Sequence, residues 1–350
     1  MIEVIGVDSH TATATVAACA VDAAGRELRS REFANDPAGH ETFASWIAEH
    51  APQGCRIGVE GALGFAFALV EHLLGEGLEV VEVPAHLTRR ETKYLHGQGR
   101  SDPRDALAIA RVTLREHKLP ALRPAGPNRS LKLVHDYRRQ LTVERSRTAN
   151  RLHADLHALY PGYRVRIPNL IRVRHLAAAT RLLRGDQRTQ ASLARRRLTK
   201  LRHFDREISE LTRELTQLVA ETHTGLLTHC GIGPLMAARI LGEVGDIRRF
   251  ASKDAFATGN GTAPIPASSG ARHRHRLNRG GNRRLNYALH VMCLTQMRID
   301  PRARTYIARR KAEGKSTAEA MRSLKRHLSD VIYNQLQADL RASLQEPQLT

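Results

Sequence analysis

The chain is poor in aromatic residues and in cysteine. Only 4% of its 350 residues are Phe, Trp or Tyr, which disfavours a surface that stacks aromatic rings on the bases of a single strand. The four cysteines, Cys19, Cys55, Cys230 and Cys293, are scattered and form no CxxC pair. We therefore expect reduced thiols, and neither a disulfide framework nor a zinc site.

Long apolar runs and a targeting signal are also missing. The most apolar stretch, residues 57–74, contains Glu60, Glu71 and His72, so no membrane-spanning helix is expected. The first residues lack the positive charge that begins a secretory signal. These features predict a cytoplasmic protein without a membrane partner.

Acidic residues are strongly outnumbered. The chain has 55 Lys and Arg against 35 Asp and Glu, a formal net charge of +20 and a pI near 10.7. Charge of this sign and size favours nucleic acid as a partner. Residues 259–298 contain no acid at all, so their arginines have no counter-charge nearby in sequence.

Four acids nevertheless occupy positions that one metal site would require. Asp8 follows an apolar strand pattern at residues 2–7, Glu60 closes a second pattern at 56–59, and Asp102 and Asp105 lie one turn apart where a helix begins. Side chains at i and i+3 of a helix share a face. Carboxylates gathered in this way suit magnesium, and two such ions can clamp a phosphodiester.

Each acid alone also has an ordinary interpretation. Asp8 can be a turn former after its strand, and Glu60 can begin a loop. Asp102 can be a capping or first-turn acid, and Asp105 can pair with an arginine on the surface. The combination favours a site, because three elements of one predicted sheet domain each contribute an acid.

The order of patterns predicts the architecture. Three antiparallel strands near residues 2–7, 13–21 and 28–33, followed by alternating helices and strands, predict an α/β mixed sheet of the ribonuclease H type over 1–118. Residues 119–222 contain a linker and Arg-rich, coiled-coil-like helices, which are either a solvated spacer or a dimerisation arm. A mainly α-helical domain is predicted over 223–310, and a helix with a tail over 311–350.

The C-terminal domain has its own candidate residues. Gly231 and Gly233 precede a helix, where backbone N–H groups can approach a phosphate, or where the chain turns tightly between packed helices. Ser269, or Ser268 beside it, could attack a phosphodiester, although a turn of small residues is the plainer interpretation. The arginines that follow predict a phosphate-binding patch or a solvated loop: Arg272, Arg274, Arg276, Arg279, Arg283 and Arg284.

These motifs resemble a known family. Gly6-Val7-Asp8, Val59-Glu60-Gly61 and Asp102-Pro103-Arg104-Asp105-Ala106 resemble the DEDD signature of a RuvC-like transposase domain. The C-terminal stretches, Cys230–Pro234, Gly261–Pro264, Ser268–Gly270 and Arg279–Leu285, are similar to the second domain of the same proteins. The chain thus resembles the insertion-sequence one-ten family of DEDD transposases as far as about Arg298.

The resemblance implies a DNA transposase and recombinase that cuts and rejoins strands to move an insertion sequence. It implies that Asp8, Glu60, Asp102 and Asp105 hold Mg2+, with two ions per site, and that Ser269 forms a covalent phosphoserine. It further implies double-stranded donor and target DNA, a structured guide RNA, and a homo-oligomer, dimer or tetramer, whose subunits share a composite site. Two alternatives stay open: a hydrolytic RuvC-like junction resolvase or nuclease, and a non-catalytic nucleic-acid-binding protein.

Overall fold

A computed structural model describes residues 1–10, 13–62, 64–93, 102–266, 275–276, 278 and 280–345. The chain forms two compact units, Met1–Gly126 with Arg248–Phe250, and Pro127–Ile247 with Ala251–Thr350. Each unit is described by itself. No helix among the described residues combines the length and the apolar character needed to cross a bilayer.

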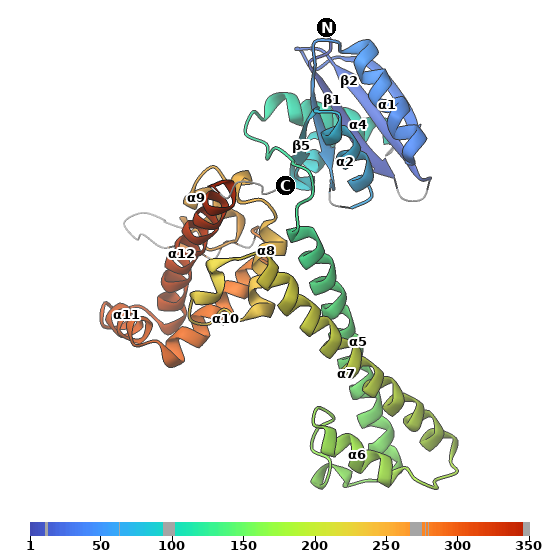
Figure 1. The fold of residues 1–350 in the computed structure, drawn as a ribbon, viewed down its shortest axis with the longest axis vertical. Coiled ribbons are helices and arrows are strands. Elements are labelled where there is room, and N and C mark those ends of the chain that lie inside the picture. Colours follow the sequence, from blue (N-terminus) through green and yellow to red (C-terminus); the bar gives the residue numbers. More distant parts are fainter. Residues whose placement is uncertain are drawn as a thin grey trace. The chain divides into compact units, whose positions relative to one another are not determined.

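The first unit is built on one mixed sheet, shown with its helices in Figure 1. The strand order is β3-β2-β1-β4-β5; β1, β2 and β3 pair antiparallel, whereas β1, β4 and β5 are parallel. This arrangement confirms the predicted ribonuclease H-like α/β class. The elements are β1 (Val4–His10), β2 (Thr15–Val21), β3 (Glu27–Ala34), α1 (Pro37–His50), β4 (Arg56–Glu60), α2 (Phe67–Gly75), β5 (Glu79–Val83), α3 (Ala85–Thr92) and α4 (Asp102–Arg115).

The two faces of the sheet are covered by different helices. Successive side chains of a strand point to opposite faces, and both faces of β1 are buried. Ile5 and Val7 join the core that includes Phe43 of α1 and Leu69 of α2. Val4, on the other face, packs with residues of α4. A helix on each side explains why the central strands are apolar on both faces.

One predicted boundary is wrong. We expected the first strand to cover residues 2–7 with Asp8 directly at its end, but β1 continues to His10. Asp8 pairs with Ala17 of β2 within the antiparallel ladder. The reason is the register of the pair: Ser9 lies opposite Val16 and His10 opposite Thr15, so β2 supplies partners for the polar end of β1, and a pattern of apolar residues does not reveal this register.

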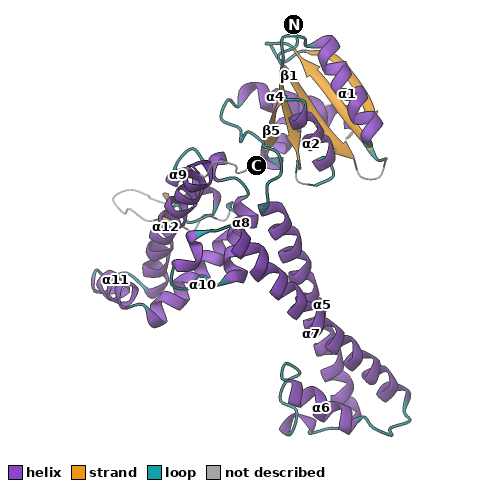
Figure 2. Cartoon of the chain, viewed as in Figure 1, coloured by secondary structure: helices purple, strands orange, loops and turns teal. Residues whose placement is uncertain are grey.

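The second unit is mainly helical, as predicted, and its helices are coloured purple in Figure 2. Two long helices, α5 (Asn128–Leu159) and α7 (Thr189–Glu221), pack against each other, with η1 (Tyr163–Val165) and α6 (Val173–Leu182) between them in sequence. The remaining elements are η2 (Gly225–Thr228), α8 (Pro234–Val244), α9 (Lys253–Gly259), β6 (Ile265–Pro266), β7 (His275–Arg276), α10 (Arg283–Ile299), α11 (Pro301–Ala312) and α12 (Thr317–Gln345). The short η3 (Ile247–Arg249) has its first residue in this unit and its last two in the first unit.

Candidate functional site

The four predicted acids come from three elements of the first unit. Asp8 lies in β1, Glu60 is the last residue of the neighbouring parallel strand β4, and Asp102 and Asp105 are in the first turn of α4. Val7 pairs with Val59, so the following residues, Asp8 and Glu60, lie at the same end of the two strands. We call these four residues the acidic cluster.

A glycine brings α4 to this end of the sheet. A Cβ atom on Gly6 would lie 2.2 Å from the Ala106 carbonyl oxygen and 2.2 Å from the Ala110 nitrogen. The helix therefore packs directly on the backbone of β1, which only glycine permits. Because Asp8 is two residues from Gly6 on the same face of the strand, and Asp105 is next to Ala106, the close approach brings strand and helix acids together.

The charges of the acidic cluster act on Asp8. The pKa of the Asp8 carboxyl rises from 3.8 to about 6. Burial is the largest cause, because desolvation penalises the ionised form. The neighbouring carboxylates act next, in the order Asp105, Glu60 and Asp102, and His10 opposes them. The acidic cluster is thus a place where negative charge lacks full compensation.

His10 is a member of the site that the sequence analysis missed. Its Nε2 lies 3.7 Å from Oδ1 of Asp102, and its positive charge, when protonated, lowers the pKa of Asp8. The period of two along a strand would have indicated it, since His10 lies two residues beyond Asp8. Only the incorrect strand end at residue 7 concealed this relation.

The side chains of the acidic cluster are not arranged as a complete metal-binding site in this structure. Among the residues that the structure describes, no group of three or more His, Cys, Asp or Glu side chains is positioned to hold a metal ion. The donor set itself fits a hard divalent cation, because it consists of carboxylate oxygens and carries uncompensated negative charge. Besides burial, the three neighbouring carboxylates contribute to the raised pKa of Asp8.

The predicted serine lies in a segment between two short strands of the second unit. Ile265 pairs with Arg276 and Pro266 with His275, so β6 and β7 form an antiparallel hairpin. Residues 267–274 connect these strands. Several predicted site residues are outside the described residues: Ser268, Ser269, Arg272, Arg274 and Arg279, together with the side chain of Arg276.

A buried polar network supports this hairpin. Asn260 is fully buried; its side chain donates to Oγ of Ser329 (2.7 Å) and accepts from the backbone N–H of Thr262 (3.1 Å). Asn282 caps α10 by accepting from the N–H groups of Arg284 and Leu285. We call Asn260, Gly261, Gly281 and Asn282 the hairpin base.

The two glycines of the hairpin base, Gly261 and Gly281, allow two backbone segments to pack closely. A Cβ on Gly281 would lie 2.3 Å from the Gly261 nitrogen, so the two backbone segments touch. The Asn282 N–H donates to the Gly259 carbonyl at 2.7 Å, and the Asn286 side chain donates to the Asn260 carbonyl at 2.9 Å. These contacts therefore hold the stretch before β6 against the start of α10.

Arg283 and Arg284 have different surroundings. Arg284 lies 2.8 Å from both carboxylate oxygens of Asp136 and 3.1 Å from Glu243, and Lys132 also pairs with Glu243 at 2.9 Å. These contacts connect α10 to α5 and α8 and favour a structural role for Arg284. Arg283 is exposed and has no recorded partner among the described residues.

The two glycines before α8 also differ. Gly231 has φ of +90°, and a Cβ there would lie 3.1 Å from the Met292 carbonyl oxygen of α10. Its surroundings are those of a tight turn between packed helices. Gly233 is the N-cap of α8, and a Cβ there would meet no atom within 4 Å, so its packing does not require glycine.

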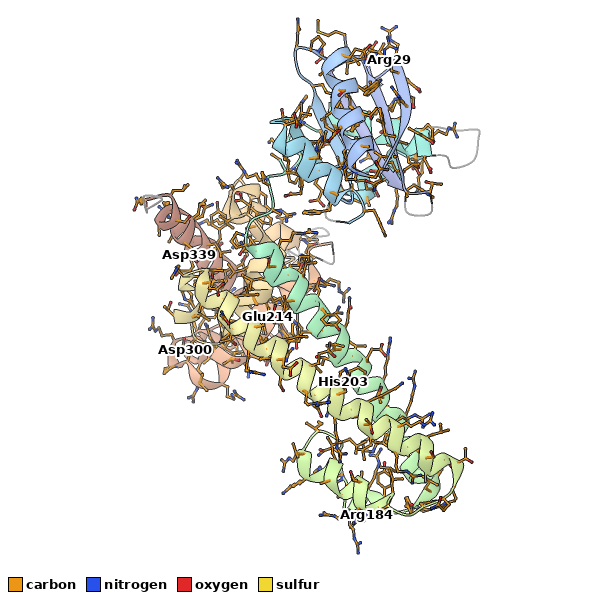
Figure 3. The ribbon with its side chains drawn as sticks, turned by 45° about the vertical axis from the view of Figure 1, so that its right-hand side comes forward. Arg29, Arg184, His203, Glu214, Asp300 and Asp339 are labelled. Carbon is orange, nitrogen blue, oxygen red and sulfur yellow. The ribbon has the colours of Figure 1, made fainter. Side chains whose placement is uncertain are left out.

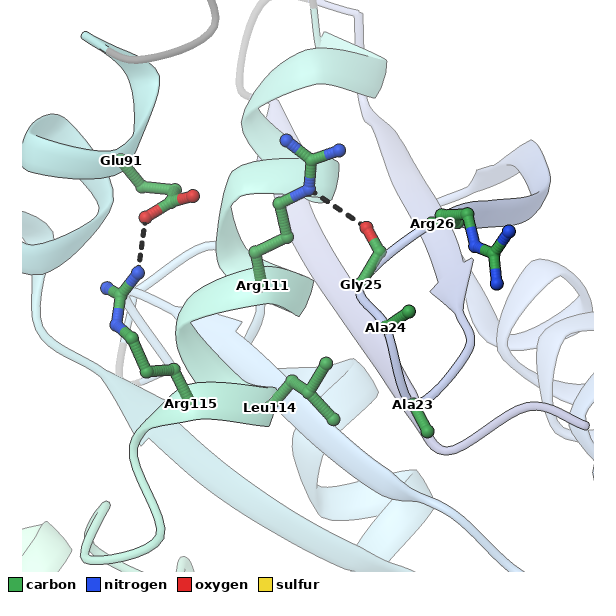
Figure 4. Close-up of a pocket in the computed structure, with 8 residues that line it drawn as sticks. All are labelled: Ala23, Ala24, Gly25, Arg26, Glu91, Arg111, Leu114 and Arg115. Carbon is green, nitrogen blue, oxygen red and sulfur yellow. Dashed lines mark hydrogen bonds and ion pairs between the residues drawn. The ribbon is translucent and has the colours of Figure 1, made fainter.

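One shallow pocket lies away from these residues. Figure 4 shows it between the β2–β3 turn and the last turns of α4. Arg111 donates to the Gly25 carbonyl at 3.0 Å, and Arg115 pairs with Glu91 at 2.6 Å. The pocket is at the opposite end of α4 from Asp102, and its arginines already have partners.

Comparisons with known proteins agree with both halves of the chain. A DEDD transposase model of the IS110 type matches residues 5–161, and the transposase model of the IS116/IS110/IS902 family matches residues 223–308. A 44.8 kDa protein of insertion element IS116 from Streptomyces clavuligerus is 26% identical over 95% of this chain and 94% of its own length. A 42 kDa protein of IS900 from Mycobacterium paratuberculosis is 25% identical over 89% and 90%.

Among solved structures, a Thermus thermophilus RuvC in complex with a Holliday junction substrate is 15% identical, with a TM-score of 0.28, over 35% of this chain and all of that one. The assignment comes from the family models and the insertion-element relatives, which match both the sheet unit and the C-terminal part. The chain belongs to the IS110 family of DEDD transposases, DNA transposases with a ribonuclease H-like sheet domain.

Proposed function

We propose that the protein cuts and rejoins DNA strands by serine attack at a magnesium-dependent site. Asp8, Glu60, Asp102 and Asp105 would hold two Mg2+ ions. Bound there, the ions supply charge stabilisation to the phosphodiester oxygens. The observation that carries the proposal is the acidic cluster, in which two neighbouring strand ends and the first turn of α4 bring four carboxylates together, and in which burial and the three other carboxylates raise the pKa of Asp8.

Ser269 is the proposed nucleophile, with Ser268 as the alternative. Its oxygen would form a bond to phosphorus while the bond to the leaving sugar oxygen breaks. The serine gives up its proton and the leaving sugar hydroxyl gains one, so the protein-linked phosphodiester conserves the bond for rejoining to another strand. The pairing of β6 with β7, between which Ser269 lies in sequence, supports this role.

The proposal extends to partners. We propose that a structured RNA guides the protein to double-stranded donor and target DNA in the cytoplasm. A homo-oligomer would combine the acidic cluster of one subunit with Ser269 of another. The formal charge of +20 supports nucleic-acid partners, and sequencing the RNA that copurifies with the protein tests the guide directly.

Trapping a protein-linked strand tests the nucleophile. We expect a covalent adduct with Mg2+ in the wild type and in Ser268→Ala, and none in Ser269→Ala, while DNA binding persists in all three. An adduct that survives in Ser269→Ala and disappears in Ser268→Ala would move the role to Ser268. Magnesium-dependent cutting without any adduct would identify a hydrolytic nuclease, and the absence of cutting would indicate a binding protein.

A further inference from the structure

The end of the α5–α7 hairpin concentrates more than half of the net charge of the chain. Residues 156–204, which we call the arm tip, contain twelve Lys and Arg and a single acid, Asp186, for a net charge of +11 out of +20. The tip has its own core, which includes Leu156, Tyr163, Leu176 and Leu198. We call the α5–α7 hairpin the arm. The α5 helix is about 48 Å long at 1.5 Å per residue, and Lys132 near its start pairs with Glu243 of α8, so the tip lies at the far end of the arm.

The acids in and near the tip are already paired. Asp186 accepts hydrogen bonds from Arg188 and Tyr160. At the base of the tip, Asp155 pairs with Arg197. Seven cations of the tip are exposed and have no recorded partner within the described part of the chain: Arg164, Arg166, Arg172, Arg181, Arg184, Arg196 and Lys200. Figure 3 shows Arg184 at this end of the second unit.

Exposed aliphatic side chains lie among these arginines. Val165 is 90% exposed, Val173 83% and Ile171 74%. They occur in the sequences Arg164-Val165-Arg166 and Ile171-Arg172-Val173-Arg174. Burial of exposed aliphatic groups lowers the free energy. Aliphatic side chains that alternate with arginines on a surface are therefore favoured to contact a partner.

The segment that presents these side chains is held in place. The hydroxyl of the buried Tyr163 donates to the carbonyl of His153 at 3.1 Å. Arg145 donates to the Leu170 carbonyl at 2.8 Å. Both Tyr163 and Leu170 are anchored in the tip core, so the arginines and aliphatic groups between and beside them form a preorganised surface.

The charge and the residue composition of the arm tip indicate which kind of partner it binds. The tip of a second copy is excluded as a symmetric partner, since two surfaces of charge +11 would repel each other. Single strands are disfavoured, because none of the three aromatic residues of the tip, Tyr160, Tyr163 and Phe204, is exposed. Duplex DNA offers a phosphate on each side of a groove for arginines, and aliphatic side chains are the groups that pack into its minor groove.

We propose that the arm tip is a docking surface for double-stranded DNA, remote along the arm from the hairpin base. Arginines such as Arg164, Arg166 and Arg172 contact the phosphates, and Ile171 and Val173 pack against the groove. This inference rests on the proposed function only in taking DNA as the partner. It adds a contact surface that neither the acidic cluster nor the serine segment requires.

The test compares two triple variants of the full chain. Arg164→Gln/Arg166→Gln/Arg172→Gln removes three free cations of the tip. Arg298→Gln/Arg302→Gln/Arg304→Gln removes three exposed cations of α10 and α11 that have no recorded side-chain partner among the described residues, and it serves as the matched control. Binding to a 30-base-pair duplex and to an RNA hairpin of equal charge is measured by fluorescence anisotropy from about 50 to 200 mM salt, the range over which phosphate contacts dominate.

We expect the tip variant to bind the duplex about 10–100-fold more weakly, with the slope of log K against log salt reduced by about 2.7, that is about 0.9 for each phosphate that is no longer neutralised. The control keeps the wild-type slope. Ile171→Ser/Val173→Ser should weaken duplex binding about 10-fold without a change of slope, because it removes no charge. Circular dichroism and thermal melting should match the wild type in every variant, since all altered side chains are exposed.

Four outcomes would overturn the inference. These are an unchanged slope in the tip triple, an equal loss in the control, a loss confined to the RNA hairpin, and a change of oligomeric mass in place of DNA affinity. If the wild type itself binds no duplex, the proposed function fails as well. If the wild type binds duplex and the tip triple binds with the same slope, only the present inference fails.

Discussion

The acidic cluster and the surroundings of the hairpin base differ in how far their buried carboxylates are compensated by partners. In the acidic cluster, burial and three neighbouring carboxylates raise the pKa of Asp8 to about 6. Around the hairpin base, Glu243 is paired with Lys132 and Arg284 and accepts from Asn282 at 2.7 Å; burial raises its pKa, but these partners outweigh burial and the pKa is lowered. Uncompensated charge is typical of a site that awaits a ligand, whereas satisfied charge holds elements together.

The largest expected effect concerns the acidic cluster. Asp102→Asn removes one carboxylate but keeps its size, so we expect strand cleavage with Mg2+ to fall by more than about 100-fold, beyond the 10–100-fold typical of outer-shell partners. DNA affinity, measured by anisotropy, should stay within about twofold. Asp22→Asn, in the β2–β3 turn, is the control and should cut normally. Full cleavage by Asp102→Asn would show that the acidic cluster is not the catalytic centre.

The hairpin base should be the most sensitive part of the second unit. Gly281→Ala places a Cβ 2.3 Å from a backbone nitrogen, so we expect a loss of about 2–4 kcal/mol of folding free energy. In Gly280→Ala the nearest atom is a side-chain oxygen at 3.5 Å, and the variant should be neutral. Urea unfolding followed by circular dichroism reports on this mainly helical unit. Equal stabilities of the two variants would contradict the close packing.

Adjacent arginines give a finer comparison. Arg284→Gln breaks ion pairs with Asp136 and Glu243, and because its side chain is 40% exposed we expect a loss of only about 1–2 kcal/mol. Arg283→Gln should keep full stability and instead weaken nucleic-acid binding with a smaller salt slope. The opposite pattern would assign the phosphate contact to Arg284.

The smallest expected effect is a gain in folding stability when the Asp8 carboxylate is removed. Asp8 has a raised pKa in the folded protein, so its ionisation opposes folding; the penalty is absent below about pH 3.8, grows up to about pH 6 and is constant above. Asp8→Asn should therefore stabilise the metal-free protein by about 1–2 kcal/mol above pH 6, after allowance for partial exposure. Fluorescence of Trp46, the single tryptophan, reports on the first unit during urea unfolding.

The pH dependence provides the check on that prediction. At pH 3 the wild type and Asp8→Asn should unfold at nearly the same urea concentration, because Asp8 is then largely protonated in both the folded and the unfolded state. Adding Mg2+ at pH 7.5 should stabilise the wild type more than the variant. A variant less stable than the wild type at every pH would show that the carboxylates do not repel one another as inferred.

Local patterns predicted most of the elements but not every boundary. Apolar periodicity indicated the mixed sheet and the long helices, since burial of one face imposes the pattern directly. It ended the first strand before Asp8, because a polar strand end depends on its partner strand. His10 was missed for the same reason. The tail beyond residue 345 and the serine segment lie outside the described residues, so Ser269 stays a prediction.

Contacts between distant residues could not be predicted. Arg284 was expected at a phosphate, yet Asp136, 148 residues away in sequence, accepts its hydrogen bonds. Asn260 and Ser329 meet in a buried pair that neither residue type signals, because both are common in exposed turns. Such partners depend on how helices pack and not on any local spacing.

The sequence by itself determined which chemistry is available: four acids at predicted element ends, a serine in a basic segment, and glycines where backbones approach. Tertiary structure decided how those groups are used. The packing of α4 on Gly6 made one cluster of separate acids, and the helices around α10 turned one of two adjacent arginines into a structural ion pair. The reason is that residue type fixes charge and size, whereas burial and distance, which set the energy of a charge, exist only in the folded chain.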